Sequence, residues 1–201
     1  MINVTRHNVG LFILTTALGT AFLGGCATKP PLSVAPGFNP QSIDTLYVLP
    51  LANLVPTKNA DAKSYTILTR NTKYYFKTRR YNYQFLADPQ LVANITAEDV
   101  EQAQPDWIKT VGPPEARWVM LFALGDLSKH SNIIIGTFNV EMDMLVFDKQ
   151  QGLVMWRDKE VLQTGGLGVV GAVVNTFTPS ENGVETTVLR LLHRFPKRQS
   201  N

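Results

Sequence analysis

A single cysteine, Cys26, is the feature that most limits how this chain can fold. With one cysteine, no disulfide can form within the chain, so the fold must be stabilised by its hydrophobic core. The chain has 201 residues, of which 44% are hydrophobic, and this leaves room for one well-packed domain. The lone thiol therefore needs an explanation other than a cross-link.

The 25 residues before Cys26 have the pattern of an export signal. Arg6 is the only strongly basic residue among them, and no acidic residue occurs. An apolar run follows from Val9 to Leu23, long enough for the hydrophobic region of a signal peptide but short for a membrane-spanning helix. Residues 1–25 are therefore predicted to be a signal peptide.

The end of this segment, Leu23-Gly24-Gly25-Cys26, has the lipobox pattern of signal peptidase II substrates. The thiol of the cysteine is alkylated by a diacylglycerol, and small residues before it let the backbone enter the protease. Cleavage after Gly25 frees an amine that can be acylated in turn, and two or three acyl chains form a stable anchor. The sequence predicts lipidation of Cys26. The alternatives are an uncleaved anchor or an ordinary signal peptide with an incidental cysteine.

The residue after the cysteine bears on the destination of the protein. It is Ala27, whereas an aspartate at this position tends to retain lipoproteins at the inner membrane of enteric-type bacteria. We therefore expect the inner leaflet of the outer membrane, with the folded domain in the periplasm.

A proline-rich tether is expected to follow. Residues 27–42 contain four prolines and no periodic apolar pattern, which is typical of an extended, solvated segment about 40 Å long. The predicted organisation is thus a lipidated cysteine and tether at 26–42, one domain at 43–196 and a polar tail at 197–201.

The domain shows alternating helical and strand patterns. Strands are predicted at 43–51, 81–86, 118–127, 133–147 and 153–162, and helices at 62–78, 96–111 and 185–195. Pro105 should kink the second helix or begin a new one. The expected fold class is α+β, with a mixed sheet of four to five strands and helices packed mainly on one face.

A glycine-rich stretch follows the last predicted strand. Gly166, Leu167, Gly168, Val169, Val170 and Gly171 spell G-x-G-x-x-G. A dinucleotide site also requires a following βαβ unit and a well-placed acid, and only one helix remains in the chain, so no cofactor is expected. The stretch is instead predicted to be a loop, a short apolar helix or a contact surface for a partner.

A cluster of basic residues interleaved with aromatics lies in the first predicted helix and just after it. Its members are Arg70, Lys73, Lys77, Arg79 and Arg80. Several of the aromatics fall on the predicted core face, so the simpler interpretation is a helix with a basic solvated side. If the cluster binds anything, the compartment favours an anionic envelope surface. Net charge is only +3, so nucleic-acid binding is not expected.

Catalytic patterns are weak. The histidines of the predicted domain are His130 and His193, and no metal-binding or nucleophile motif surrounds them. Acids occur on or near the predicted strands, at Asp126, Glu141, Asp143, Asp158 and Glu160. Alternation on a half-solvated sheet explains them without chemistry, so the protein is not expected to be an enzyme.

Four short segments carry a family resemblance: Leu46–Pro50, Ala116–Leu121, the hairpin from Asp148 to Trp156, and Leu191–Pro196. Through them the domain resembles bacterial periplasmic lipoproteins with the fold of the TolB N-terminal domain, an architecture shared by the CsgG and LpoB lipoproteins. The chain lacks a long insertion of the kind from which CsgG builds its barrel. The resemblance implies interaction rather than catalysis.

Three functions follow as hypotheses. The leading one is a non-catalytic, outer-membrane-anchored lipoprotein that binds an envelope protein through a sheet edge or the glycine-rich stretch, with a homo-oligomer as a further possibility. The second is a carrier of lipid or another small ligand, with Gly165–Phe177 as a lid. The third is a hydrolase, which requires two acids converging in a cleft at about 5–10 Å.

Overall fold

A mixed, open sheet of seven strands forms the centre of the structure, a computed structural model that describes residues 31–55, 62–131, 135–167 and 180–198. The strand order is β1-β7-β6-β5-β2-β4, and β3 also pairs with β5. The strands are β1 (Ser33–Val34), β2 (Leu46–Val48), β3 (Ala52–Asn53), β4 (Tyr83–Phe85), β5 (Trp118–Ser131), β6 (Ile135–Asp148) and β7 (Leu153–Leu167). The predicted α+β class and mixed sheet are confirmed, but the predicted count of four to five strands is wrong, because β1 joins the sheet and the first predicted strand is divided into β2 and β3.

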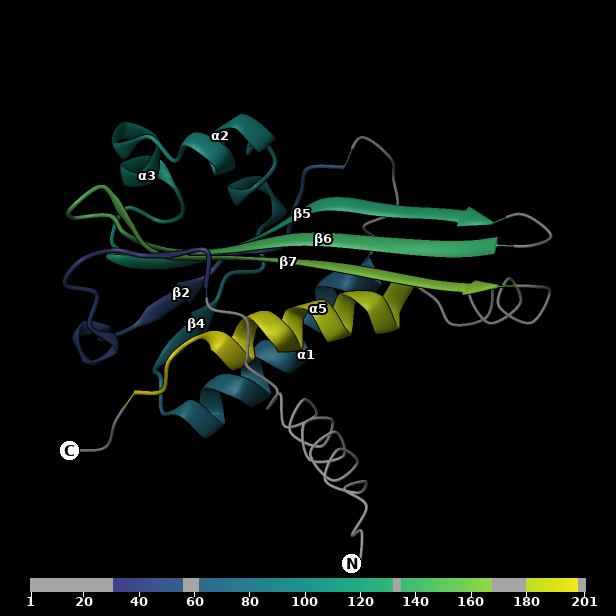
Figure 1. The fold of residues 1–201 in the computed structure, drawn as a ribbon. Helices are drawn as coiled ribbons and strands as arrows, with labels where there is room; N and C mark the ends of the chain where they lie inside the picture. Colours follow the sequence, from purple (N-terminus) through teal and green to yellow (C-terminus); the bar gives the residue numbers. More distant parts are fainter. Residues whose placement is uncertain (1–30, 56–61, 132–134, 168–179, 199–201) are drawn as a thin grey trace, which may run out of the picture.

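Three long antiparallel strands, β5, β6 and β7, form the larger part of this sheet (Figure 1). Alternate residues of β6 face opposite sides of the sheet, so that Met142 and Met144 lie in one core cluster and Leu145 and Phe147 in the other. A slip of one residue would exchange these two sets. A tight turn joins β6 to β7, and Gly152 adopts a φ of +66° there, which favours glycine. Asp148 fixes the turn by accepting a hydrogen bond from the backbone N–H of Gln150 at 3.0 Å.

The remaining part of the sheet is parallel. Strand β2 lies between β4 and β5 and runs parallel to both. Helix α1 (Ala62–Arg79) connects β2 and β3 to β4, as expected for parallel neighbours that need a crossover. The predicted strand at 43–51 is divided, because the chain leaves the ladder at Leu49 and Pro50 and pairs again as β3.

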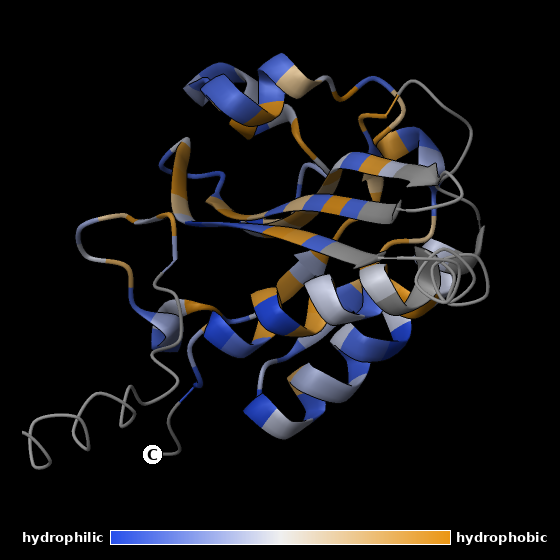
Figure 2. Ribbon diagram, turned by 45° about the vertical axis from the view of Figure 1, so that its right-hand side comes forward, coloured by the Kyte–Doolittle hydropathy of each residue, from blue (hydrophilic) through white to orange (hydrophobic). Residues whose placement is uncertain are grey.

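Helices cover both faces of the sheet (Figure 1). Helices α1 and α5 (Ser180–Arg194) lie on one face, and α2 (Ala97–Gln102) and α3 (Pro105–Thr110) lie on the other. The two long helices share one face, as predicted, but the cover of the other face by α2 and α3 was not predicted. The reason for this cover is the central strand β5, whose continuous apolar sequence needs cover on both sides. Figure 2 shows the apolar residues gathered toward the sheet and the hydrophilic ones outside.

Sequence signals at the α2–α3 region correspond to real boundaries. Thr96 caps α2 in a capping box, in which its hydroxyl accepts from the N–H of Asp99 and the Asp99 carboxylate accepts from the N–H of Thr96. Ala103 ends α2 in the left-handed conformation. Pro105 then begins α3, so the second of the two predicted outcomes at this proline is the observed one.

Phe195 occupies the centre of the core between α1, α5 and the sheet. Its ring is fully buried, and its centroid lies 5.4 Å from Tyr81, 5.6 Å from Trp156 and 6.4 Å from Phe76. These rings come from the end of α5, from α1, from the segment before β4 and from β7. The residue therefore joins segments that are far apart in the sequence.

The folded part begins earlier than the sequence predicts. Ser33 and Val34 pair with Arg157 and Trp156 of β7, in a stretch that the proline content assigned to the tether. Phe38 packs its ring 5.8 Å from Trp156 and 6.3 Å from Phe195. Within 27–42, the part from Ser33 onward is thus anchored to the domain, because its apolar side chains find places on the core.

Removing the Phe195 ring should destabilise the whole domain. We expect Phe195→Ala to lower the free energy of unfolding by about 3–5 kcal/mol, because it opens a cavity among several aromatic rings. Leu189→Ala on the same helix is the matched control, since Leu189 is 43% exposed and should cost less than about 1 kcal/mol. Urea unfolding measures both values, and equal losses would contradict this description of the core.

Candidate functional site

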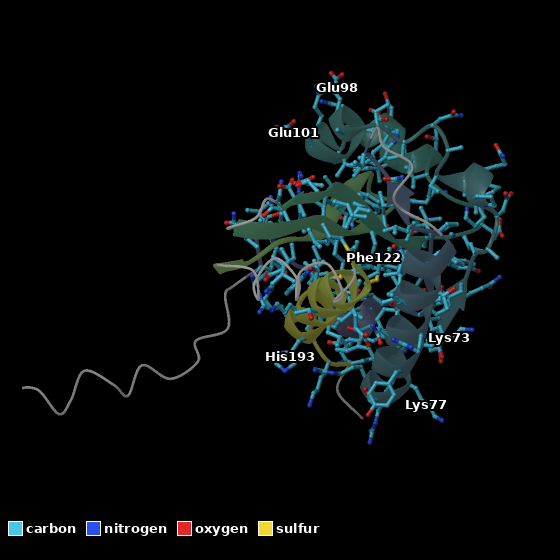
Figure 3. All side chains as sticks on the ribbon, turned by 90° about the vertical axis from the view of Figure 1, so that its right-hand side faces the viewer. Lys73, Lys77, Glu98, Glu101, Phe122 and His193 are labelled. Atoms are coloured by element: carbon cyan, nitrogen blue, oxygen red, sulfur yellow. The ribbon has the colours of Figure 1, made fainter. Side chains whose placement is uncertain are left out.

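The predicted basic cluster lies along the outer side of α1 and at its end. Arg70, Lys73 and Lys77 are exposed at spacings of three and four residues, so they share one face. Tyr74 lies on the same side and is 71% exposed. Figure 3 shows Lys73 and Lys77 pointing away from the sheet. The sequence-based interpretation of a solvated basic face is consistent with this arrangement.

Some of these cations also stabilise the domain. The guanidinium of Arg70 pairs with Glu185 of α5 at 3.0 Å. The ammonium of Lys73 lies 5.6 Å from the centre of the Phe85 ring. The guanidinium of Arg79 lies 4.5 Å from the centre of the Tyr75 ring. Of these three contacts, only the pair of Arg70 with Glu185 brings an opposite charge, so the face stays predominantly cationic.

The aromatic residues within the cluster belong mainly to the core. Tyr75 and Tyr81 are buried, and their hydroxyls donate to the backbone carbonyls of Phe195 and Pro196. Burial raises the pKa of Tyr75 to about 12, against a smaller lowering by Arg79. Burial also raises the pKa of Tyr81. These rings are therefore fixed as neutral hydrogen-bond donors and are not stacking platforms for a nucleic acid.

Strand β7 carries four consecutive charged residues whose side chains alternate between the two faces of the sheet. Asp158 and Glu160 face α5, where Arg194 pairs with them at 2.5 and 2.9 Å. Arg190 adds a second contact to Glu160 at 2.9 Å. Because Asp158 and Arg194 are almost fully buried, this cluster attaches the helix to the strand at a fixed position.

The protonation state of Glu160 follows from its partners. Burial raises its pKa, but the hydrogen bonds from Arg190 and Arg194 outweigh this effect, and the net shift is downward. Glu160 therefore stays ionised well below neutral pH. A carboxylate held in this way acts as a structural ion rather than a proton donor.

The other two charged residues of β7, Arg157 and Lys159, face α2 and meet acids of β6. Lys159 lies 2.5 Å from Glu141 and 3.9 Å from Asp143, while Arg157 lies 3.3 Å from Asp143. These four side chains line a hollow of about 270 Å³ between the sheet and α2. Arg157 also donates to the backbone carbonyl of Glu101 in α2 at 3.0 Å, which connects the helix to the sheet.

A register shift in β5 makes room for this cluster. The ladder between β5 and β6 shifts between Leu124 and Asp126, which leaves Gly125 opposite the Glu141 side chain. A Cβ at Gly125 would lie 3.1 Å from Glu141 Oε1, so a larger residue would push that carboxylate from its place. Burial raises the pKa of Asp143, although Lys159 and Arg157 oppose the effect.

The acids on the predicted strands therefore do not form one cluster. Asp158 and Glu160 lie on the α5 face, while Glu141 and Asp143 lie on the α2 face. Glu141 and Asp143 do converge on one hollow, as the hydrolase hypothesis requires. Both are held by cations, however, and Asp143 is nearly fully buried. The two acids thus form ion pairs that connect β6 to β7 and stabilise the sheet.

Two of the residues named as a partner contact belong to a strand. Gly166 and Leu167 continue β7 and pair with Gly136 and Ile135. Gly168, Val169, Val170 and Gly171 lie outside the described residues, as does most of the proposed lid 165–177. Strand β7 is thus longer than the predicted 153–162, because its backbone stays paired with β6 as far as Leu167.

The predicted lipidation site, Cys26, and its neighbours Leu23, Gly24 and Gly25 also lie outside the described residues. Within the described ranges, none of the helices is both long and apolar enough to cross a membrane. Across the same ranges, no group of three or more His, Cys, Asp and Glu side chains could hold a metal ion.

Comparison with known proteins yields structural neighbours. No family model and no curated protein matches the sequence. PelC from Paraburkholderia phytofirmans, solved as a dodecamer, has a TM-score of 0.48 at 14% identity and covers 83% of this chain and 96% of its own. Lipoprotein GNA1162 from Neisseria meningitidis has a TM-score of 0.43 at 13% identity, covering 74% and 97%.

A minor lipoprotein from Acinetobacter baumannii has a TM-score of 0.40 at 6% identity and covers 76% of this chain and 91% of its own. Two of these three neighbours are thus bacterial lipoproteins by name.

The buried ion cluster between β7 and α5 can be tested directly. Arg194→Met should lower the free energy of unfolding by about 3–5 kcal/mol, because it leaves Asp158 and Glu160 without their buried partner. Arg190→Met is the control, since the Arg190 side chain is 51% exposed and its loss should cost under about 1 kcal/mol. Chemical denaturation of both variants gives the comparison. Similar losses would contradict the assigned role of Arg194.

Acid should weaken the same cluster. The folded state lowers the pKa of Glu160 from 4.5, so unfolded protein binds more protons just below that pH. The stability from Glu160 is present above about pH 4.5 and is lost as the pH falls through the folded pKa. Glu160→Gln should flatten the acid side of the stability curve by at most about 1.4 kcal/mol per pH unit. An unchanged slope in urea titrations at several pH values would contradict this.

Proposed function

We propose that the protein is a non-catalytic lipoprotein of the bacterial envelope, anchored through a lipidated Cys26 to the inner leaflet of the outer membrane. The observation that carries the proposal is the lipobox Leu23-Gly24-Gly25-Cys26, which places the only cysteine of the chain directly after an apolar export signal. The folded domain lies in the periplasm, and its fold is of the TolB N-terminal type.

The start of the folded domain supports an anchor at this place. Ser33 already pairs with β7, so seven residues after Cys26 the chain belongs to the sheet. Seven extended residues span at most about 25 Å. The anchor therefore holds the domain close to the bilayer rather than at the end of a long tether.

The outer edge of β7 is the proposed contact for a protein partner. Strand β1 pairs only with Trp156 and Arg157, so beyond Arg157 no further strand covers this edge in the part of the chain that the structure describes. Val161 is 53% exposed there. An uncovered edge with exposed apolar side chains offers backbone hydrogen bonds to a strand of another envelope protein or of a second copy.

The charged side chains of the sheet support a role without catalysis. Glu141, Asp143, Asp158 and Glu160 each form an ion pair with Lys or Arg. These pairs connect strands to each other and to a helix. The carboxylates are thus used in holding the fold together, which leaves the sheet edge as the surface for interaction.

Substitution of Cys26 tests the anchor. Cys26→Ala should leave the precursor uncleaved and without lipid, because the acceptor thiol is absent, and the protein should leave the outer-membrane fraction. Mass spectrometry and membrane fractionation measure these outcomes. Ala27→Ser is the control, since the lipobox itself is unchanged. A Cys26→Ala variant that is processed and located like the parent protein would overturn the proposal.

Crosslinking in cells tests the contact edge. A photo-reactive residue in place of Gln163, exposed on β7, should capture a defined envelope protein or a second copy. The same residue in place of Gln102, exposed on α2, serves as the control and should not capture it. Equal capture from both positions, or reproducible capture from neither, would contradict the assignment of the edge.

A further inference from the structure

The two helical layers of the domain carry opposite charges. The segment 62–81, which contains α1, has six basic residues and no acid, whereas 86–117, which contains α2 and α3, has six acids and two bases. Figure 3 shows Lys73 and Lys77 on the side opposite Glu98 and Glu101. The sheet lies between the two layers, so the protein is strongly dipolar across its thickness.

The cationic side can be defined by its exposed residues. We use the name cationic surface for Arg70, Lys73, Lys77, Arg80 and Lys197 together with the exposed ring of Tyr74. Lys197 joins this set because the neighbouring Pro196 accepts a hydrogen bond from the Tyr81 hydroxyl at 2.9 Å, next to Arg80. Glu185 is the acid that pairs with this surface, through Arg70.

The chain enters the domain at the end where α1 and α5 both finish. Val34 lies opposite Trp156, whose ring is 5.6 Å from Phe195, and Phe38 lies 6.3 Å from Phe195. Phe195 in turn touches Tyr81 at the end of the cationic surface. Leu32, just before the first strand, is 60% exposed. The chain therefore enters the domain at the end where Arg80 and Lys197 lie, from the sheet edge opposite β4.

We propose that the cationic surface rests on anionic phospholipid headgroups of the bilayer that holds the anchor, and that this contact turns the acidic α2–α3 side away from the membrane. The inference rests on the proposed lipidation of Cys26. The lipid brings the domain within about 25 Å of the bilayer, and the charges then determine which side of the domain faces the bilayer.

The magnitudes favour this orientation. Each Lys or Arg near an anionic membrane strengthens the contact roughly fivefold, and the attraction fades over about 8 Å at physiological salt. Five exposed cations on one side outweigh Glu185, the acid that pairs with them among the described residues. Tyr74 can lie at headgroup level, where aromatic rings with a polar tip are favoured. The acidic layer is kept outside the screening distance by the thickness of the sheet.

The experiment uses the mature, lipidated protein in vesicles. Once Cys26 carries lipid, an introduced cysteine is the only free thiol, so a fluorophore can be attached at Thr78→Cys beside the cationic surface or at Gln102→Cys on α2. Both positions are exposed. The vesicles contain a headgroup-attached quencher and either phosphatidylcholine alone or a mixture with phosphatidylglycerol.

We expect quenching at position 78 to exceed that at position 102 several-fold in the anionic vesicles, and the difference to vanish in neutral vesicles or at high salt. Lys77→Glu combined with Arg80→Glu should abolish the difference, while Lys109→Glu on α3 should not. Equal quenching at both positions in anionic vesicles would overturn the orientation. Protein without lipid by mass spectrometry would overturn the anchor itself, and the orientation with it.

Discussion

Burial of both faces of strand β5 is the constraint on which the rest of the structure depends. From Trp118 to Leu124 its side chains are almost completely inaccessible. A strand of this kind cannot lie at a surface, so it needs strands on both edges and helices on both faces. The parallel pairing with β2, the antiparallel pairing with β6 and the two helical layers all satisfy this one requirement.

The two faces then differ in how they are closed. On the α1–α5 side, aromatic rings gather around Phe195, and the ion cluster of Arg194 fixes α5 against β7. On the α2–α3 side, the short helices cover Leu121 and Leu145, while Arg157 joins α2 to the sheet beside a hollow lined by charged side chains. The first layer is a continuous packed core, and the second combines apolar contacts with polar ones.

The alternation of side chains along β7 explains how four adjacent charged residues contribute to two separate ion clusters. Arg157, Asp158, Lys159 and Glu160 are adjacent in sequence, but neighbouring residues point to opposite faces of a strand. One face thus receives both bases of this run, and the other face receives both acids. Arg157 and Lys159 meet acids of β6, whereas Asp158 and Glu160 meet arginines of α5. Charge in the sheet is balanced locally, whereas the net charges of the two helical layers remain opposite. Because of this difference in charge, an anionic surface attracts the α1 side of the domain and repels the α2–α3 side.

The sequence by itself determined the positions of the long strands and of most helices, because period-two and helical apolar patterns depend on local geometry. It also supplied the basic face of α1 and a break in the helix at Pro105, which are local chemical signals, and the lipobox at Cys26 stays a prediction from the same kind of signal. Only the tertiary structure decided that Ser33 and Val34 join the sheet, that α2 and α3 cover a second face, and that the strand acids separate into two ion clusters. These features depend on contacts between residues far apart in the chain, which no local pattern encodes.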